Sequence, residues 1–380
     1  MNSDSYCVII KTHPVTLAPE LFSGARGYLD ACTIGLPPLT TSAAMVSAVG
    51  QWTRGDASAE EYAEVVERCR ALYAALVNVP GAEVAIGSSV STMVAQIAAL
   101  VPDGAQVLCA DGDFSSMVYP FYALAHRGVT VRHAAPADLA ESITPDTFLV
   151  SFSLIQSATG EVADAEAITE AARRDGTLTL CDTTQAVGCY PVDGSIFDAT
   201  VCHAYKWLCA PRGAAFLTLG DRIRSIAHSG WSSTSVPAQA GWYAGNSIWD
   251  SCYGPQIDLS ADARRFDTSP AWLSWVGTEK SLELFTGFDI SEVWQNNIAL
   301  ANTLAENLGL DARDQAIMSW VDPDGRHAAR LSRAGISAST RAGRVRVGFH
   351  LWNTLRDVEL VTDAITDATR GHKNTLETQS

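Results

Sequence analysis

Apolar runs typical of strands alternate with longer helical patterns along the first two thirds of the chain. Apolar residues at i, i+3 and i+4 spacing predict a helix over 59–78, and further helical patterns follow at 90–101, 118–127 and 164–175. Strand-like runs stand between them at 105–111, 129–135, 147–154 and 177–182. This alternation predicts an α/β fold, in which helices cover a parallel-rich sheet through right-handed crossovers.

The pattern changes near residue 275. Two helical stretches, 279–288 and 291–308, precede a strand-like run at 344–352 and a final helix at 354–369. The stretch from 225 to 257 is rich in Gly, Ser, Trp and Tyr, and is too long for a simple connector, so we interpret it as a functional or interface loop.

A chain of 380 residues exceeds what one compact core usually supports, so two unequal domains are expected. We predict a large domain over 15–275 and a smaller C-terminal α+β domain over 276–372. Residues 1–14 are expected to pack near the small domain, and 373–380 to form a solvated tail.

Composition and charge narrow the class of partner. Hydrophobic residues make up 47% of the chain and charged residues 18%, which is typical of a well-packed soluble enzyme. The formal charge of −16 argues against nucleic acid or an anionic membrane as the main partner, and favours small molecules or other proteins. The N-terminus lacks the pattern of a secretory signal, and no apolar run is long enough to span a membrane, so we expect a cytoplasmic protein.

The nine cysteines are scattered without a CxxC pair. This spacing speaks against a zinc site and against a disulfide framework, and we predict no bound metal. Most of the cysteines lie in apolar runs, where a small buried thiol is the ordinary interpretation. Cys209 follows Lys206 by three residues, and we interpret it as a packing residue.

A single lysine stands among small, aromatic and apolar neighbours in CHAYKWLCAPRGAAF, residues 202–216. Strand-like runs flank Lys206, so it is expected where a strand opens into a turn, and sites in α/β proteins collect at strand ends. One interpretation is a surface lysine whose stem lies along apolar neighbours. The other is a buried ammonium, which must be neutralised, paired or covalently converted, and a Schiff base is the chemistry that explains it best.

Asp182 ends the apolar run LTLCD and precedes a predicted turn. A helix N-cap is one role for such an aspartate. The other is an electrostatic partner for a cationic ring nitrogen, since Lys206 follows at the end of the next strand-like run. Two strand ends of one sheet place both groups on one edge.

Three further places in the chain have residues that suit ligand binding. Ser88 and Ser89 come between a strand end and a helical pattern, where they either cap the helix or help its free amides to receive an anion. Phe114 follows another strand end and either packs in the core or covers a planar ligand. Arg346, in the alternating RVRVGF, is either an exposed strand charge or a fork for a carboxylate.

Taken together, these segments resemble class V of the fold-type I pyridoxal 5′-phosphate enzymes, which contains cysteine desulfurases, isopenicillin N epimerase-like proteins and kynureninase. The resemblance extends in order over nearly the whole chain. Its segments are YLDACTIGLPP (28–38), GSSVST (87–92), GDFSS (112–116), SLIQSATGEVAD (153–164), CDTTQAVG (181–188), HAYKWLCAPRG (203–213), GWYAG (241–245), RRFDTSPAW (264–272) and RVGFHLWNT (346–354).

The resemblance implies a large domain with a mostly parallel, mixed seven-stranded sheet, a small α+β domain, and bound pyridoxal 5′-phosphate. It implies that Lys206 carries the cofactor covalently, that Asp182 pairs with the pyridine nitrogen, and that Phe114 stacks on the ring. Gln185 is then expected near the ring oxygen, with the phosphate held by Ser88, Ser89, His203 and Tyr205.

The same resemblance implies a homodimer with active sites at its interface, in which Trp242 reaches the phosphate of the neighbouring subunit. Arg346 stands at the spacing of the family arginine that binds the substrate α-carboxylate. An amino acid is the implied substrate, and Lys206 and Asp182 are the expected catalytic residues.

The residues that precede Arg346 bear on the reaction type. Desulfurases need a nucleophilic cysteine on the loop before the carboxylate-binding arginine, and residues 327–346 contain none. We expect β-elimination of a cysteine S-conjugate, in the manner of C–S lyases of ergothioneine and lincosamide pathways of antibiotic biosynthesis. The alternatives are decarboxylation-coupled oxidative deamination to an aldehyde, an aminotransferase, racemisation, kynureninase-type cleavage, and a non-catalytic cofactor-binding module.

Overall fold

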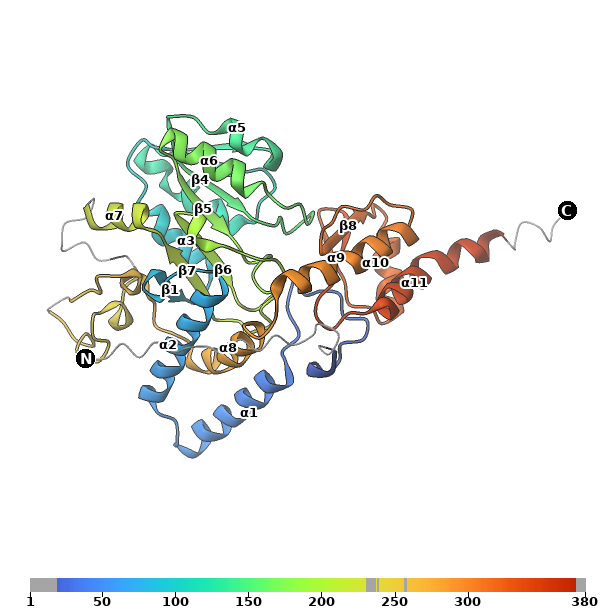
Figure 1. Ribbon diagram of the computed structural model, residues 1–380, viewed down its shortest axis with the longest axis horizontal. Helices are drawn as coiled ribbons and strands as arrows, with labels where there is room; N and C mark the ends of the chain where they lie inside the picture. The colour runs from blue at the N-terminus through green and yellow to red at the C-terminus, as the bar shows by residue number, and fades with distance from the viewer. Residues whose placement is uncertain (1–18, 230–236, 238, 256–257, 374–380) are drawn as a thin grey trace.

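The protein is described by a computed structural model covering residues 19–229, 237, 239–255 and 258–373 (Figure 1). The expectations for the segment 1–14 and for residues 374–380 of the predicted tail lie outside these residues. Two sheets make up the β-structure of the described chain, one of seven strands and one of three.

The seven-stranded sheet has the spatial order β1-β7-β6-β5-β4-β2-β3. Strand β7 is antiparallel to both of its neighbours, and the other strands are parallel, as the sequence pattern predicts. Its strands are β1 (Val84–Gly87), β2 (Gln106–Ala110), β3 (Thr130–Ala134), β4 (Thr147–Ser153), β5 (Leu178–Asp182), β6 (Ala199–His203) and β7 (Ala215–Leu219).

The described residues contain eleven α-helices. They are α1 (Leu39–Arg54), α2 (Ala59–Leu76), α3 (Val90–Ala98), α4 (Tyr119–Tyr122), α5 (Leu139–Ser142), α6 (Ala165–Asp175), α7 (Asp221–Ser229), α8 (Trp272–Phe285), α9 (Ile290–Asn307), α10 (Arg326–Arg333) and α11 (Leu355–Lys373).

Side chains along a strand point alternately to its two faces, so neighbouring residues of the large sheet pack against helices on opposite sides. Leu149 and Val201 pack into a core with α3, whereas Val150 and Cys202 pack into a second core with α2, α6 and α8. Figure 1 shows helices on both sides of the sheet. The sheet is therefore buried on both faces, which leaves its edges, and above all the strand ends, for chemistry.

The small sheet has the order β8-β10-β9 and is antiparallel throughout, with β8 (Ile317–Val321), β9 (Ser339–Arg341) and β10 (Arg344–Gly348). Val345 and Val347 face a third core that includes Leu304 of α9 and Val361 of α11. The small sheet and its helices α9, α10 and α11 lie at one end of the molecule (Figure 1).

Local structure differs from the sequence prediction at several places. The predicted helix 118–127 is one α-turn, α4, followed by a 3₁₀ helix over Ala123–Arg127. The sequence analysis did not identify α1, whose outward surface carries apolar residues instead of a clean polar stripe. None of the described helices is both long and apolar enough to span a bilayer.

Candidate active site

The carboxyl ends of β2, β4, β5 and β6 bring the predicted cofactor residues to one edge of the large sheet. Asp182 is the last residue of β5, and His203 is the last residue of the neighbouring β6. Ser153, at the end of β4, pairs in register with Asp182, and Phe114 follows β2 by four residues. Parallel pairing places these ends together, so a site dispersed over 90 residues of sequence becomes one cluster.

Lys206 lies in the turn after β6 and is only 8% exposed. Its ammonium nitrogen sits 5.4 Å from the centroid of the Phe114 ring. Burial lowers the pKa of Lys206, and the charge of Arg346 lowers it further, while the carboxylate of Asp182 opposes both. The interpretation of Lys206 as a snorkelling surface lysine is therefore wrong.

Tight backbone packing fixes the turn that carries Lys206. A Cβ at Gly35 would overlap the Lys206 carbonyl oxygen, and a Cβ at Gly188 would lie 2.6 Å from the carbonyl oxygen of Trp207. The indole of Trp207 donates to Oε1 of Gln185 over 2.6 Å, and the imidazole Nε2 of His350 lies 2.7 Å from the Trp207 carbonyl oxygen. The chain direction at Lys206 is thus set by neighbours from three separate segments.

Asp182 is held by the turn that follows it. Its Oδ1 accepts a hydrogen bond of 2.8 Å from the backbone N–H of Thr184. Burial raises the pKa of Asp182, and the hydrogen bond from Thr184 and the charge of Lys206 oppose this. An Asx-type hydrogen bond of this kind satisfies only part of the carboxylate, which leaves the second oxygen for a cationic partner.

Asp113 is a second carboxylate of this cluster, and the sequence analysis did not single it out. It precedes Phe114, and its Oδ2 accepts from the backbone N–H of Ser153 over 2.8 Å. Burial raises the pKa of Asp113 to about 7, hydrogen bonds from Ser153 and Gln156 oppose that rise, and the charge of Asp182 adds to it. Its position inside the segment GDFSS was the available signal.

The start of α3 and the end of β6 form the candidate phosphate region. Ser89 is the N-cap of α3, and its Oγ accepts from the backbone N–H of Thr92. Ser88 is exposed beside it. The N–H of Val90 donates to Nε2 of His203 over 3.1 Å, so the two elements are directly linked.

His203 and Tyr205 pack edge to face, with ring centroids 4.8 Å apart. Burial is the main cause that lowers the pKa of His203 to about 3, so the ring is neutral. Since Nε2 accepts from Val90, the ring hydrogen belongs on Nδ1, which is buried and has no hydrogen-bond partner among the described residues. The Arg212 guanidinium lies over the Tyr205 ring, 5.0 Å from its centroid.

Gln185 and Trp242 are the two remaining residues that the resemblance implies for the cofactor. The side-chain amide of Gln185 donates to the Cys32 carbonyl oxygen and to Oγ of Ser157, so it links three segments of the site. Trp242 lies in the 3₁₀ turn Trp242–Ala244 and packs against Tyr243 and Trp249. No described interaction joins Trp242 to the Lys206 cluster of the same chain.

Arg346 enters the site from the small sheet and is 1% exposed, so the interpretation as an exposed strand charge is wrong. Its Nη2 donates to Oγ1 of Thr33 over 2.7 Å, its Nε to Oγ of Ser339 over 3.0 Å, and its Nη1 to both oxygens of Ser157. All of these partners are neutral. A buried guanidinium without a carboxylate is prepared to receive one from a ligand.

Thr33 and Ser157 were missed as site residues, although both lie in segments that carry the resemblance. Ser339 was missed because the strand β9 is only three residues long and follows a loop without a clear pattern. Their roles depend on the contact between the two sheets, which no local pattern reveals.

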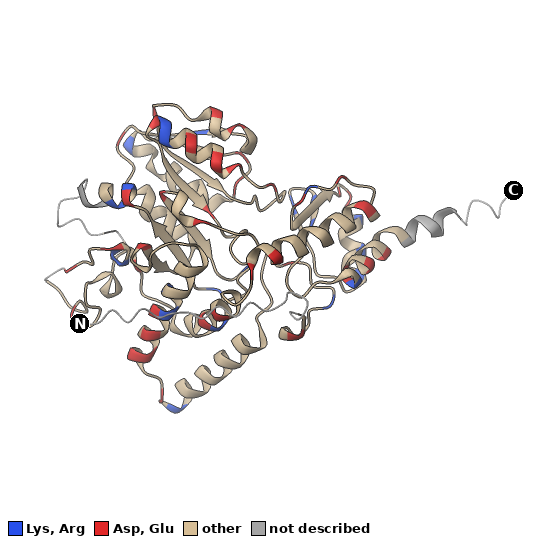
Figure 2. Cartoon of the chain, viewed as in Figure 1, with Lys and Arg blue, Asp and Glu red and all other residues tan. Residues whose placement is uncertain are grey.

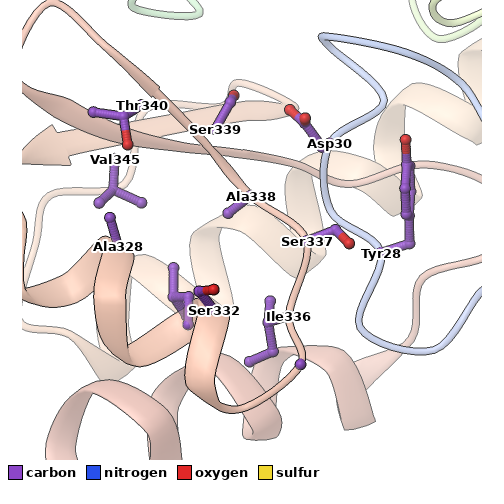
Figure 3. A pocket seen from close by; sticks show the side chains of 12 residues that line it. Tyr28, Asp30, Ala328, Ser332, Ile336, Ser337, Ala338, Ser339, Thr340 and Val345 are labelled. Carbon is purple, nitrogen blue, oxygen red and sulfur yellow. The ribbon is translucent and has the colours of Figure 1, made fainter.

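A pocket of about 490 Å³ adjoins this region on the small sheet. Figure 3 shows Asp30 and Ser339 at one end of it and Ser332 and Ile336 at the other. Its lining does not include Lys206 or Asp182. We therefore assign the chemistry to the strand-end cluster and not to this pocket.

The residues present fit pyridoxal 5′-phosphate. The cofactor requires an amine for its aldehyde, an acid for its ring nitrogen, a flat apolar cover and donors for its phosphate. Lys206, Asp182 and Phe114 have these properties in one cluster, and the unpartnered Nδ1–H of His203 lies beside the start of α3. The fold and the site together define a fold-type I pyridoxal phosphate enzyme.

The chain belongs to the aminotransferase class V family, since the family model described as Aminotransferase class-V matches residues 42–311. A kynureninase of Deinococcus radiodurans is 28% identical over 297 residues, which are 73% of this chain and 69% of that protein. An isopenicillin N epimerase of Amycolatopsis lactamdurans is 31% identical over 212 residues, which are 52% of this chain and 48% of that protein.

Solved structures confirm the fold. A complex of the cystine C–S lyase C-DES with cysteine persulfide has a TM-score of 0.79 at 20% identity, covering 90% of this chain and 98% of that one. The cysteine desulfurase CsdA of Escherichia coli has a TM-score of 0.77 at 18% identity, covering 95% of this chain and 99% of that one. The family, the fold and the cofactor predicted from the sequence are thereby confirmed: this is a pyridoxal phosphate-dependent class V enzyme.

Proposed function

We propose that the protein is a C–S lyase, which cleaves a cysteine S-conjugate by β-elimination and releases a thiol. The observation that carries this proposal is the neutral, hydroxyl-rich surrounding of Arg346. Where a persulfide-forming enzyme needs a cysteine on the loop before the arginine, residues 327–346 contain none, and Ser339 contacts the guanidinium.

The buried thiol of Cys32 does not replace that cysteine. Cys32 is 1% exposed, and burial raises its pKa to about 11, although the charges of Arg346 and Lys206 oppose this. At neutral pH it is a protonated thiol and a poor nucleophile. β-Elimination needs no nucleophilic side chain, which agrees with the residues present.

In the proposed reaction, Arg346 binds the substrate α-carboxylate and Lys206 moves the protons. Pyridoxal phosphate, when bound, supplies an electron sink for the pair left at the substrate Cα. Lys206 Nζ takes the Cα proton, since burial lowers its pKa and so makes the neutral amine easier to form. The Cβ–S bond then breaks, with its electron pair leaving on sulfur.

The overall equation is balanced by one water molecule. An S-substituted cysteine and water give a thiol, pyruvate and ammonia, with no change in net oxidation state. No external oxidant or second amino acid is required, in contrast to the oxidative deamination and aminotransferase alternatives.

The cofactor assignments are part of the proposal. Asp182 pairs with the ring nitrogen, Phe114 covers the ring, and Gln185 lies toward the ring oxygen. The phosphate is bound by four groups: Ser88, Ser89, His203 and Tyr205. The polar start of α3 supports this choice, because a helix N-terminus presents free N–H groups and partial positive charge.

We also propose a homodimer in which Trp242 reaches the phosphate region of the partner. Two observations support it. No interaction among the described residues joins Trp242 to Lys206 of its own chain, and α1 presents apolar side chains to solvent, with Val46 74% and Trp52 65% exposed. Exposed apolar surface of this kind commonly marks a protein interface.

The test is an absorbance spectrum of the purified protein, recorded before and after an S-substituted cysteine is added, with thiol and pyruvate assays on the same sample. Lys206→Ala should lose thiol release, whereas Lys280→Ala, which removes a half-buried lysine paired with Glu283, should retain it. Sustained turnover by Lys206→Ala would contradict the mechanism. A spectral change without thiol would instead support transamination or oxidative deamination.

Kynureninase-type cleavage is a second candidate, favoured by the relative from Deinococcus radiodurans, which matches 73% of this chain. The same wild-type and variant proteins should be assayed with kynurenine. Activity on kynurenine without thiol release from cysteine conjugates would establish this alternative over the C–S lyase.

A further inference from the structure

Three arginines lie on one face of the small sheet, and we refer to Arg341, Arg344 and Arg346 as the arginine face. Arg344 and Arg346 are two residues apart on β10, so they point the same way, opposite to Val345 and Val347 of the core. Arg341 of β9 is the direct cross-strand partner of Arg344. Like charges directly opposite each other on a sheet destabilise it, so this arrangement calls for an explanation.

The partners of the arginine face are neutral. Arg344 donates to Oγ and to the carbonyl oxygen of Ser319, and Arg341 donates to the carbonyl oxygen of Thr340. Within the described residues none of the three arginines forms an ion pair, whereas nine other arginines do. The repulsion within the face is therefore not relieved by a described carboxylate.

Arg341 and Arg346 converge on a single oxygen at the active site. Nη2 of Arg346 donates to Oγ1 of Thr33 over 2.7 Å, and Nη2 of Arg341 donates to the same oxygen over 3.2 Å. Arg346 is buried, whereas Arg341 is exposed at the open side of the pair. The two guanidinium groups thus form an inner and an outer cation at the same entrance.

One guanidinium supplies the single positive charge that the α-carboxylate of an amino acid requires, so the amino-acid group itself needs only Arg346. Arg341 remains as an unused cation next to it. The chain as a whole carries a charge of −16, and acidic residues are spread over the outer helices (Figure 2), so an anionic substrate is repelled elsewhere. A local pair of cations at the site would therefore attract an anionic ligand that the rest of the surface repels.

We infer that the substrate has a second anionic group, and that Arg341 binds it. This rests on the proposed function: the substrate class becomes cysteine S-conjugates whose sulfur substituent ends in a carboxylate. Arg346 binds the α-carboxylate, and Arg341 selects the side-chain carboxylate at the entrance. Arg344 adds positive charge from the neighbouring strand.

Two ligands of matched shape test this inference, S-carboxymethyl-cysteine and its neutral amide, S-carbamoylmethyl-cysteine. Their binding to the holoenzyme is measured by isothermal titration calorimetry, and thiol release is measured on the same samples. The wild type should bind the acid about tenfold more tightly than the amide, as expected for one additional charge-assisted contact. The preference should decrease at high salt, because an exposed ion pair is screened.

Arg341→Gln should reduce the acid-to-amide preference to about one and leave the affinity for the amide unchanged. Arg341→Lys should restore part of the preference, since it restores the charge without the fork. Arg333→Gln is the matched control, because Arg333 is an exposed arginine on α10 that bonds only to a carbonyl oxygen of its own helix. This control should bind both ligands as the wild type does.

Equal binding of acid and amide by the wild type would overturn the inference. So would a loss of affinity for both ligands in Arg341→Gln, because that result indicates a structural role. The two proposals can fail separately. A preference for the acid without thiol release would contradict the C–S lyase and support the binding role of Arg341. Thiol release without a preference would support the C–S lyase and contradict the binding role of Arg341.

Discussion

The backbone N–H of Val90 donates to Nε2 of His203 over 3.1 Å, which joins the first turn of α3 to the end of β6. The hydrogen bond fixes the tautomer of the imidazole and leaves its Nδ1–H buried without a described partner. A buried, oriented donor without a partner is costly unless a ligand completes it. This relationship is the clearest structural reason to assign the phosphate to this region.

Substitution of His203 by alanine should weaken cofactor binding. It removes the oriented donor and also frees the start of α3, so we expect a roughly 5- to 100-fold higher Kd for pyridoxal phosphate. Titration of the apoenzyme with the cofactor, followed by absorbance, measures the effect. His126→Ala is the control, since His126 lies on the exposed 3₁₀ helix Ala123–Arg127, and an unchanged Kd for His203→Ala would contradict the assignment.

Replacement of Arg346 by glutamine should raise KM for the amino-acid substrate more than it lowers kcat. The guanidinium provides the charge that the α-carboxylate requires, and the neutral oxygens of Thr33, Ser157 and Ser339 cannot replace it. A roughly 10- to 100-fold increase in KM is expected from the loss of one charge-assisted interaction. Steady-state kinetics provide the measurement, and an unchanged KM would show that the carboxylate binds elsewhere.

His350 should make stability dependent on pH. It is fully buried, and burial lowers its pKa from 6.5 to about 4. Between pH 4 and pH 6.5 the imidazole is protonated in the unfolded chain and neutral in the folded chain. The contribution of His350 to the free energy of unfolding is therefore fully present above pH 6.5 and is lost as the pH falls toward 4. The loss amounts to about 2 kcal/mol between pH 7 and pH 5.

The measurement for His350 is the Tm of the wild type and of His350→Gln across this pH range. Glutamine does not titrate, and its amide retains a donor for the Trp207 carbonyl oxygen. The wild type should lose a few degrees more than the variant between pH 7 and pH 5. Parallel curves for the two proteins would exclude His350 as the source.

Gly35→Ala should disrupt the turn that carries Lys206. A Cβ at this position overlaps the Lys206 carbonyl oxygen and lies 2.9 Å from the Cα of Cys209, so backbone must move. We expect a destabilisation of about 3 kcal/mol or more and a loss of cofactor absorbance. The control is Gly81→Ala, whose Cβ would meet no atom within 4 Å; if both variants behave alike in Tm and spectrum, the packing argument is wrong.

The apolar surface of α1 should mediate self-association. Val46→Glu and Trp52→Glu place charge on residues that are exposed in the single chain, so the monomer should fold normally while the dimer weakens. Light scattering at several concentrations measures the mass. A wild-type monomer, or an unchanged dimer in both variants, would exclude α1 as the interface.

Much of the site could be predicted because its residues stand at strand ends. Asp182 ends an apolar run, Lys206 follows the next one, and Ser89 precedes a helical pattern. The apolar periodicity and the residues that end each strand are therefore enough to place all three at one edge of a parallel sheet. The ordered segments then led to the family and the cofactor, both of which the comparisons confirm.

Other features depended on contacts between distant segments. The neutral oxygens around Arg346 come from residues 33, 157 and 339, and the cross-strand pairing of Arg341 with Arg344 requires the register of β9. The sequence by itself determined which residues end the strands and which charges exist, because these follow from local periodicity. Only the tertiary structure decided that Arg346 is buried among neutral oxygens beside a second arginine, because burial and charge pairing depend on how two sheets meet.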